Sequence, residues 1–163
     1  MEDVIDVFEK LNIEYELVRH PAIFGKADEE KVKDIDFCGG IVCKNLFLKD
    51  KKANTYYLVS LPKDKRANLK KISDEIGCAR FSFGNDEELW EKLHIKPGSV
   101  SILNVIEAPD TDVIFVIDKD ILNIPKVSFH PNDNTASMVF EPCNIEKIMK
   151  EYNKHYMFLE VEE

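Results

Sequence analysis

Residues 41–61 read IVCKNLFLKDKKANTYYLVSL, and this stretch decides the fold. Two apolar runs, Ile41–Leu48 and Thr55–Leu61, flank the polar segment Asp50–Asn54. Runs rich in β-branched and aromatic residues on either side of a short polar segment are typical of a β-hairpin. We therefore expect two antiparallel core strands, with the rest of the chain packed around them.

One charged residue interrupts the first run. Lys44 lies between Val42 and Leu46, and a buried ammonium group without a partner is unfavourable by several kcal/mol. We expect its side chain to reach into a cleft, where it could hold a phosphate or carboxylate or act as a nucleophile. The alternative is that Lys44 extends from the strand edge into solvent. Asn45 faces the other side of the strand unless the strand twists or bulges, so it either shares the ligand or bonds to a neighbouring backbone.

Two later segments, Lys96–Val100 (KPGSV) and Ser128–Pro131 (SFHP), combine turn residues with expected strand ends, where loops expose groups to ligands. In the first, Gly98 permits close approach of a ligand, and backbone N–H groups at Gly98 and Ser99 could bind an anion or a developing oxyanion. A tight turn between a helix and a strand would also use Pro-Gly, so a purely structural role is equally open. In the second, His130 could be a general base, a hydrogen-bond anchor or a structural group.

The three segments together resemble a known family. K-N-L-F-L (Lys44–Leu48), P-G-S-V (Pro97–Val100) and F-H-P-x-x-N-T (Phe129–Thr135) occur in the order found in YbaK/ProX-type editing domains associated with prolyl-tRNA synthetase. The resemblance covers nearly the whole chain and implies a free-standing aminoacyl-tRNA deacylase that clears mischarged tRNA(Pro) without a cofactor. Two positions depart from the family pattern: His94 stands where a glycine is common, and Ile102-Leu103 replaces the usual Pro-Phe.

The resemblance also implies roles for individual residues. Lys44 occupies the position of the family's invariant lysine, which contacts the aminoacylated 3′ end of tRNA, and the backbone at Gly98-Ser99 would stabilise the carbonyl oxygen. The expected catalytic residues are Lys44, Gly98, Ser99 and His130, and the expected substrate-binding residues are Asn45, His20, Phe129, Asn134 and Thr135. Family members with the F-H-P-x-x-N-T version are usually linked to alanyl-tRNA(Pro), whereas the YbaK branch prefers cysteinyl-tRNA(Pro). Alanine is therefore the expected acyl group.

A non-catalytic module that binds aminoacyl- or prolyl-tRNA would use the same pocket, so the residues leave this alternative open. The sequence has no Ser-His-Asp ordering, zinc-protease motif, phosphate-binding loop or dinucleotide fingerprint. This absence does not argue against a deacylase, because an activated aminoacyl ester can be hydrolysed by a water that backbone groups and the terminal ribose hydroxyl position.

Length and composition indicate one soluble domain spanning residues 1–163. The chain is 44% hydrophobic and 33% charged, with no apolar run near the ~20 residues that a membrane span requires. Its start lacks the pattern of a signal peptide, so we expect a cytoplasmic protein. Four cysteines are spread without a C-x-x-C pair, which favours free thiols over a metal site, and no metal is expected.

The net charge of −9 argues against broad nucleic-acid binding but allows a small basic patch. The candidate tRNA-binding residues are Lys63, Lys65, Arg66 and Lys70, with Lys71 beside them. The alternative is a solvated helix face. We expect the 3′ acceptor end of tRNA(Pro) as partner, prolyl-tRNA synthetase as a further candidate partner, and a monomer.

Hydrophobic periodicity predicts a single α+β domain with a mixed, mostly antiparallel sheet and helices packed outside, in the manner of the YbaK fold. Helices are expected over residues 2–11, about 27–35, 69–76, from 86 with Leu89, Trp90 and Leu93 inward, and from a cap near Asn144. Strands are expected over residues 15–18, 41–48, 55–61, 80–83, 100–105, 113–117, 126–129 and 135–140.

Overall fold

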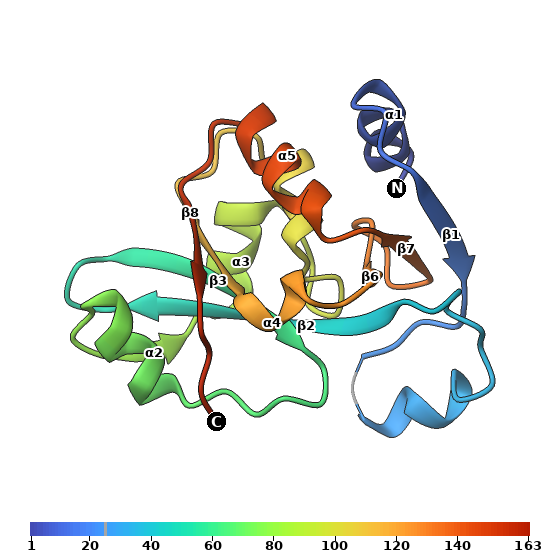
Figure 1. Ribbon diagram of the computed structural model, residues 1–163. Helices are drawn as coiled ribbons and strands as arrows, with labels where there is room; N and C mark the ends of the chain where they lie inside the picture. Colours follow the sequence, from blue (N-terminus) through green and yellow to red (C-terminus); the bar gives the residue numbers. More distant parts are fainter. Residues whose placement is uncertain (25) are drawn as a thin grey trace.

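The computed structural model describes residues 1–24 and 26–163, and its framework is an eight-stranded mixed sheet. The strand order is β1-β7-β6-β2-β3-β5-β8, with β4 paired to β2 (Figure 1). The strands are β1 (Tyr15–Arg19), β2 (Ile41–Asp50), β3 (Thr55–Pro62), β4 (Phe81–Phe83), β5 (Ile114–Asp118), β6 (Val127–Phe129), β7 (Ala136–Phe140) and β8 (Tyr156–Leu159). The helices are α1 (Glu2–Lys10), η1 (Lys26–Lys31), α2 (Leu69–Ile76), α3 (Asp86–Leu93), η2 (Ile102–Ile106), α4 (Lys119–Leu122) and α5 (Cys143–Glu151).

The predicted hairpin of β2 and β3 is confirmed and forms the centre of the sheet. The two strands pair antiparallel over eight positions, with Lys44 opposite Leu61 and Asp50 opposite Thr55. The start of β2 also pairs parallel with β6, and its end pairs with β4, so this one strand joins the two halves of the sheet. Four of the seven strand pairings are antiparallel, which confirms the predicted α+β class with a mixed sheet.

The hairpin separates two hydrophobic cores because side chains alternate across a strand. Phe47 and Leu58 face the larger core, which also receives side chains from α1, α3, η2 and α5. Leu48 and Tyr57 face the smaller core, which α2 covers. The same alternation places Lys44 on the smaller-core side of β2 and Asn45 on the opposite side.

One predicted strand is wrong. Residues 102–106 form the 3₁₀-helix η2, although a strand was expected over 100–105. The Ser101 hydroxyl accepts the Leu103 N–H at 3.1 Å, and the Asn104 side-chain oxygen accepts the Ser101 N–H at 2.8 Å. This reciprocal capping starts a helix. Periodicity could not reveal it, because every residue from Ile102 to Ile106 is buried.

Smaller differences occur in the other helices. Trp90 of α3 was expected to point inward but is 55% exposed, while Leu89 and Leu93 are buried as predicted. Helix α5 begins at Cys143 after Pro142, so Asn144 is not its cap and instead donates its side-chain amide to the Glu141 carbonyl. Helix η1 is shorter than predicted, and α4 and the half-exposed edge strand β8 were not predicted. None of the helices in the described residues is long and apolar enough to cross a membrane.

Candidate functional site

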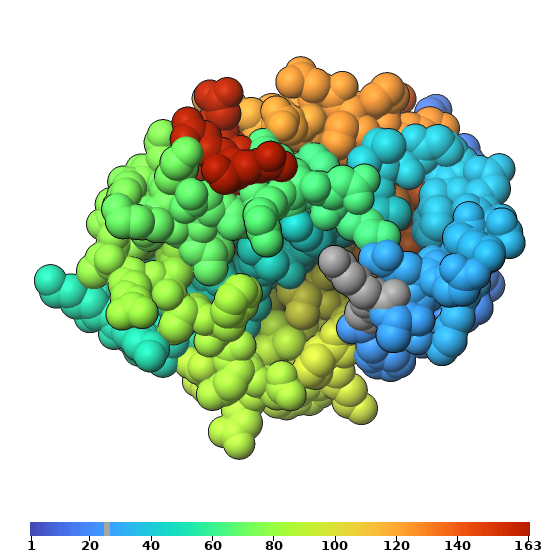
Figure 2. Space-filling view, turned by 90° about the horizontal axis from the view of Figure 1, so that it is seen from below, coloured from blue at the N-terminus to red at the C-terminus, as the bar shows by residue number. Residues whose placement is uncertain are grey.

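A cavity of about 430 Å³ lies between the sheet and the segment that follows β1. We call residues 21–24 and 26–38 the cover segment. The sheet side of the cavity is lined by Val42, Lys63, His130 and Ser137, and the cover segment provides Ile23, Glu29, Val32, Lys33 and Phe37. Figure 2 shows a hollow between the blue cover segment and the green residues after β3, with brown atoms of the β6–β7 region at its bottom. An apolar cavity with a few convergent polar groups is the usual form of a small-molecule site.

His130 lies at the end of β6 and lines this cavity, as its predicted role requires. Its Nδ1 lies 2.9 Å from the carbonyl oxygen of Ala136. A carbonyl can only accept a hydrogen bond, so Nδ1 carries the proton and Nε2 keeps a lone pair. Burial lowers the pKa of His130 below its usual 6.5, which keeps the ring neutral at neutral pH. Nε2 can therefore accept a proton from a reacting group.

His20 and Ser137 form a second polar pair beside His130. The Nδ1 of His20 donates to the Pro21 carbonyl at 2.9 Å, so its Nε2 accepts the Ser137 hydroxyl at 2.8 Å. The rings of His20 and His130 are 5.8 Å apart between centroids. A hydroxyl bonded to an imidazole that a third group orients is also the arrangement of an activated nucleophile.

Ser137 was not predicted as a site residue. It interrupts an apolar strand, and that position could have identified it. The register of β6 and β7 places Ser137 on the same sheet face as Ser128, which lies opposite Val42 of the cavity wall. Ser128 is 2% exposed, and its hydroxyl is without a hydrogen-bond partner in the described part of the chain. This sheet face therefore carries more polar groups than the fold itself uses.

Lys44 lies on the same face of β2 as Val42, two residues further along the strand. The β2–β6 pairing ends at Val42 and Ser128, and Lys44 and His130 each follow two residues later on their own segment. Lys44 itself is not among the residues that line the cavity. Lys63 is paired with Glu29 at 3.1 Å, but within residues 1–24 and 26–163 no carboxylate lies within ion-pair distance of Lys44. The half-buried Lys44 thus keeps its charge available for an anionic ligand.

The turn at Gly98 meets the loop that follows His130. Gly98 has a φ of +92°, and a Cβ at this position would lie 2.9 Å from Cδ1 of Phe24 and 3.3 Å from Nδ2 of Asn134. Both the backbone conformation and the close approach therefore require glycine. The structure thus brings together the predicted residues Gly98 and Asn134, and it adds Phe24, which sequence reasoning missed.

Two asparagines hold this turn in place. The Asn104 side-chain amide donates to the Ser99 carbonyl at 3.1 Å and to the side-chain oxygen of Asn132. Asn132 in turn donates to the Leu103 carbonyl, so the turn and the β6–β7 loop are tied together. The Ser99 N–H donates to the Lys96 carbonyl at 3.3 Å, whereas the Gly98 N–H has no hydrogen-bond partner in the part of the chain that the structure describes. The only sequence signal for Asn104 is the capping pattern Ser101-x-x-Asn104.

None of the five residues predicted to bind substrate lines the cavity itself, although His20 bonds to Ser137 of the cavity wall and Asn134 lies beside Gly98. Asn45 accepts the Ser60 hydroxyl at 2.6 Å on the opposite face of β2, because successive side chains alternate and no bulge interrupts the β2–β3 pairing at that position. Phe129 is 2% exposed and packs in the larger core. The Thr135 hydroxyl bonds to Asp133, although the Thr135 carbonyl accepts the His20 N–H at 2.9 Å and so helps to position that ring.

The predicted basic patch is largely neutralised by acidic neighbours. The ammonium of Lys65 lies 2.8 Å from both Asp118 and Asp120, and the Asp118 side chain is fully buried. Lys70 pairs with Asp74 at 3.5 Å across one helical turn. Lys65 is therefore engaged within the fold, and the prediction of tRNA contacts stays a prediction for Lys63, Lys65, Arg66 and Lys70.

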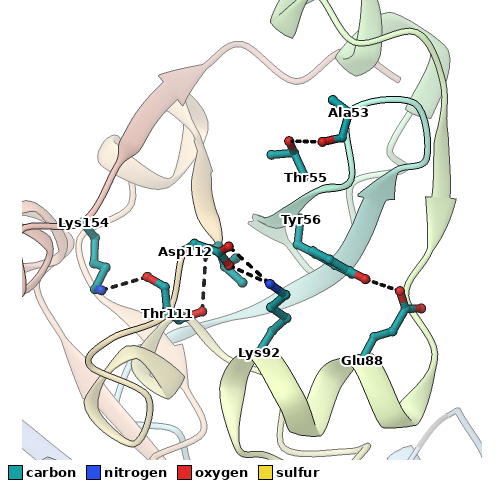
Figure 3. A network of polar contacts seen from close by, with 9 residues as sticks. Ala53, Thr55, Tyr56, Glu88, Lys92, Thr111, Asp112 and Lys154 are labelled. Carbon is teal, nitrogen blue, oxygen red and sulfur yellow. Dashed lines mark hydrogen bonds and ion pairs between the residues drawn. The ribbon is translucent and has the colours of Figure 1, made fainter.

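A separate polar cluster lies between β2, β3 and α3. Glu88 accepts hydrogen bonds from the Tyr56 hydroxyl, from the Lys49 ammonium at 2.9 Å and from the Asn85 N–H at 3.0 Å. These donors lower the pKa of Glu88 to about 2. Figure 3 shows the bond from Tyr56 and, beside it, the pairing of Lys92 with Asp112. No group of three His, Cys, Asp or Glu side chains in the described residues is placed to hold a metal ion.

Comparison with known proteins agrees with the predicted resemblance. Residues 27–148 match the aminoacyl-tRNA editing domain family. The chain is 35% identical over 158 residues to the prolyl-tRNA editing protein ProX of Acetoanaerobium sticklandii, covering 97% of this chain and 95% of that protein. It is 36% identical over 136 residues to prolyl-tRNA synthetase associated domain-containing protein 1 of Mus musculus, covering 81% and 79%. Its fold is similar to that of a crystallised candidate trans-editing enzyme for prolyl tRNA synthetase, with a TM-score of 0.72 at 19% identity over 99% of this chain and 96% of the other.

Proposed function

This chain belongs to the aminoacyl-tRNA editing domain family, and we propose that it hydrolyses the aminoacyl ester of mischarged tRNA(Pro), with alanyl-tRNA(Pro) as its main substrate. The observation that carries the proposal is the neutral His130 in the cavity, whose Nε2 is free to accept a proton. The names of the relatives support an editing role on prolyl-tRNA.

The proposed reaction uses a water as the nucleophile. His130 Nε2 takes one proton from this water while its oxygen attacks the ester carbonyl, and the Gly98 N–H stabilises the negative oxygen that forms. The bond to the terminal ribose oxygen then breaks, and that oxygen receives the proton, which releases the amino acid and free tRNA. Lys44 holds the terminal phosphate as a point charge, so that the ester is fixed near His130.

Selection for alanine has to rest on size. A methyl side chain offers little binding energy on which a pocket can discriminate, so the site must exclude the larger prolyl ring. The apolar residues of the cover segment, Ile23, Val32 and Phe37, are in the cavity wall and are proposed to set this limit.

The decisive experiment incubates the purified protein with alanyl-, cysteinyl- and prolyl-tRNA(Pro) and measures ester loss against the spontaneous rate. We expect alanyl-tRNA(Pro) to be hydrolysed fastest and prolyl-tRNA(Pro) to be spared. The rate should fall as the pH drops through the lowered pKa of His130, because protonation removes the Nε2 lone pair. Loss of none of the three esters would leave only the non-catalytic binding module, and faster loss of the cysteinyl ester would overturn the preference for alanine.

Matched variants test the role of His130. His130→Gln should slow the reaction by about 10²–10⁴-fold, the usual contribution of a general base, whereas His155→Gln on the surface should not. Ser137→Ala should retain most of the activity if water is the nucleophile. An inactive Ser137→Ala variant, together with an acylated wild-type protein trapped by rapid acid quenching, would instead assign the attack to Ser137.

A further inference from the structure

Phe24 places a large apolar ring in water at the site. Its exposed fraction is 72%, higher than that of the other exposed large hydrophobic residues, such as Phe83 at 62% and Trp90 at 55%. It directly follows Ile23, which lines the cavity, and its ring lies against the Gly98 backbone. We propose that Phe24 is a stacking platform for the terminal adenine of the tRNA substrate, an inference that rests on the proposed function.

Neighbouring groups hold the Phe24 backbone and contact one side of its ring. The Phe24 N–H donates to a carboxylate oxygen of Asp28 at 2.9 Å, and the other oxygen of Asp28 pairs with Lys31 at 2.8 Å. On one side, the ring is in contact with the turn that Gly98 makes possible, beside the Asn134 amide. A ring whose backbone is held and whose other side is free loses less entropy when a second flat group stacks on it than a ring on a mobile backbone does.

The chemistry of the substrate fits this position. The 3′ end of tRNA is single-stranded, and proteins recognise unpaired bases chiefly by stacking them on aromatic side chains. With the acyl group in the cavity, the ribose and its adenine must lie at the cavity mouth, within one nucleotide of the ester. Phe24 and Asn134 are the stacking and hydrogen-bonding groups at the Gly98 turn.

Because the protein carries a net negative charge, an uncharged stacking contact matters more for its affinity to tRNA. A chain with a net charge of −9 cannot rely on a broad positive face to hold a polyanion. Its basic residues at the cavity are also partly engaged, since Lys63 is paired with Glu29. Stacking on a neutral ring supplies affinity that neither repulsion nor salt removes.

The test compares Phe24→Ala, Phe24→Leu and Phe24→Trp with the matched control Phe83→Ala. In single-turnover deacylation of alanyl-tRNA(Pro), Phe24→Ala should raise the half-saturating protein concentration by about 5- to 150-fold, the range for loss of one base stack. The rate at saturation should stay nearly unchanged. Phe24→Trp should restore affinity, whereas Phe24→Leu should not, because it keeps the apolar volume but lacks a flat aromatic face.

A binding measurement separates this inference from the proposed function. In the Trp90→Phe background, the Trp in Phe24→Trp is the only tryptophan, and addition of a CCA trinucleotide should quench its fluorescence. Unchanged affinity in Phe24→Ala, wild-type affinity in Phe24→Leu, or an equal loss of affinity in Phe83→Ala would each overturn the stacking role. Failure of the wild-type protein to hydrolyse any aminoacyl-tRNA would refute the proposed function alone, since quenching by CCA would still report on the platform.

Discussion

The polar cluster at Glu88 and the polar groups at the His130 cavity use their side chains in opposite ways. In the first, Glu88 is bonded by Tyr56 and Lys49, and the pKa of its carboxyl falls to about 2. In the second, His130 uses only one ring nitrogen within the fold, and Lys44 has no carboxylate partner in the described residues. Satisfied polar groups stabilise a fold, whereas groups held with open hydrogen-bonding capacity are available to a ligand.

Two lysines on one strand illustrate the difference. Lys44 and Lys49 are both in β2, five residues apart, and therefore face opposite sides of the sheet. Lys49 finds its partner in Glu88, which arrives from α3 39 residues later in the chain. Whether each lysine has an ion-pair partner thus depends on the element that packs over it and not on its neighbours in sequence.

Among the lysines, the largest expected effect on turnover comes from removing the unpaired one, Lys44. Lys44→Ala should slow deacylation by about 10²–10³-fold, since it deletes a charge that fixes the substrate, while the free energy of unfolding changes little. Lys44→Arg should rescue poorly, because a planar guanidinium does not replace a point charge. Lys49→Ala is the matched control and should lose stability but not turnover. Single-turnover rates and urea unfolding measure both, and wild-type turnover in Lys44→Ala would refute the assignment.

Removing a paired lysine should instead unfold the protein more easily. Lys65→Met leaves the fully buried Asp118 carboxylate without its counter-ion and should lower the free energy of unfolding by about 3 kcal/mol. Lys70→Met, which breaks only an exposed pair with Asp74, should cost less than about 0.5 kcal/mol. Equal effects of the two changes in urea titrations would contradict the structural role of Lys65.

Substitution of Gly98 should have an intermediate effect on the rate of deacylation. Gly98→Val should destabilise the protein and slow deacylation by about 100-fold, since the new side chain would push against Phe24 and Asn134 and displace the site. Ser99→Ala should lose much less, because the proposed contribution of this turn is its backbone. Kinetics of both variants on alanyl-tRNA(Pro) decide the matter: an inactive Ser99→Ala with an active Gly98→Val would make the hydroxyl the functional group.

A smaller effect, on stability alone, is expected in the polar cluster at Glu88. Glu88→Gln keeps the side-chain oxygen that caps α3 but removes the charge, so it should cost about 1–2 kcal/mol of stability without affecting turnover. The folded-state pKa of Glu88 lies below the ordinary 4.5, so its contribution is complete above that pH and is lost as the pH falls toward 2. Urea unfolding should therefore show the gap between wild type and variant closing over this range. A gap that stays constant down to the acid limit would mean that the charge of Glu88 contributes nothing.

The smallest effect concerns the remaining basic residues. Replacing Arg66 and Lys70 with Ala should weaken tRNA binding and flatten the slope of log affinity against log salt by about 0.7 to 0.9 for each phosphate that is no longer neutralised. The amino acid that is removed should not change. An unchanged slope, measured by filter binding over a salt series, would show that these residues form only a solvated face.

The sequence predicted those features that depend on local pattern. The β2–β3 hairpin and the end of α2 at Gly77, which has a φ of +89°, follow from apolar runs and turn residues. Lys44 and His130 were found because a charge in an apolar run and a histidine before proline are visible in the sequence. Phe24 was missed because its role depends on a contact with Gly98 that only the folded chain creates. Ser137 was missed although its place in an apolar strand is visible in the sequence, because its bond to His20 is not.

The position of His94 shows why a departure from a family pattern need not alter a turn. A glycine is common there among the relatives that the sequence resembles, and His94 ends α3 with a φ of +54°. The backbone thus keeps the left-handed conformation that glycine adopts readily, at some energetic cost to the histidine. The sequence could indicate the substitution but not that the backbone would accommodate it.

The large sequence separation between His20 and Ser137 has a consequence for how the protein folds during its synthesis. The two residues are 117 positions apart, and the strands that carry their neighbourhood, β1 and β7, pair with each other. During synthesis, β1 leaves the ribosome long before β7 exists, so the cavity at His130 cannot assemble on the nascent chain until most of the polypeptide has been translated. Such non-local pairing makes folding slow. A ribosome stalled before residue 137 therefore carries a chain with an unpaired first strand and an incomplete cavity.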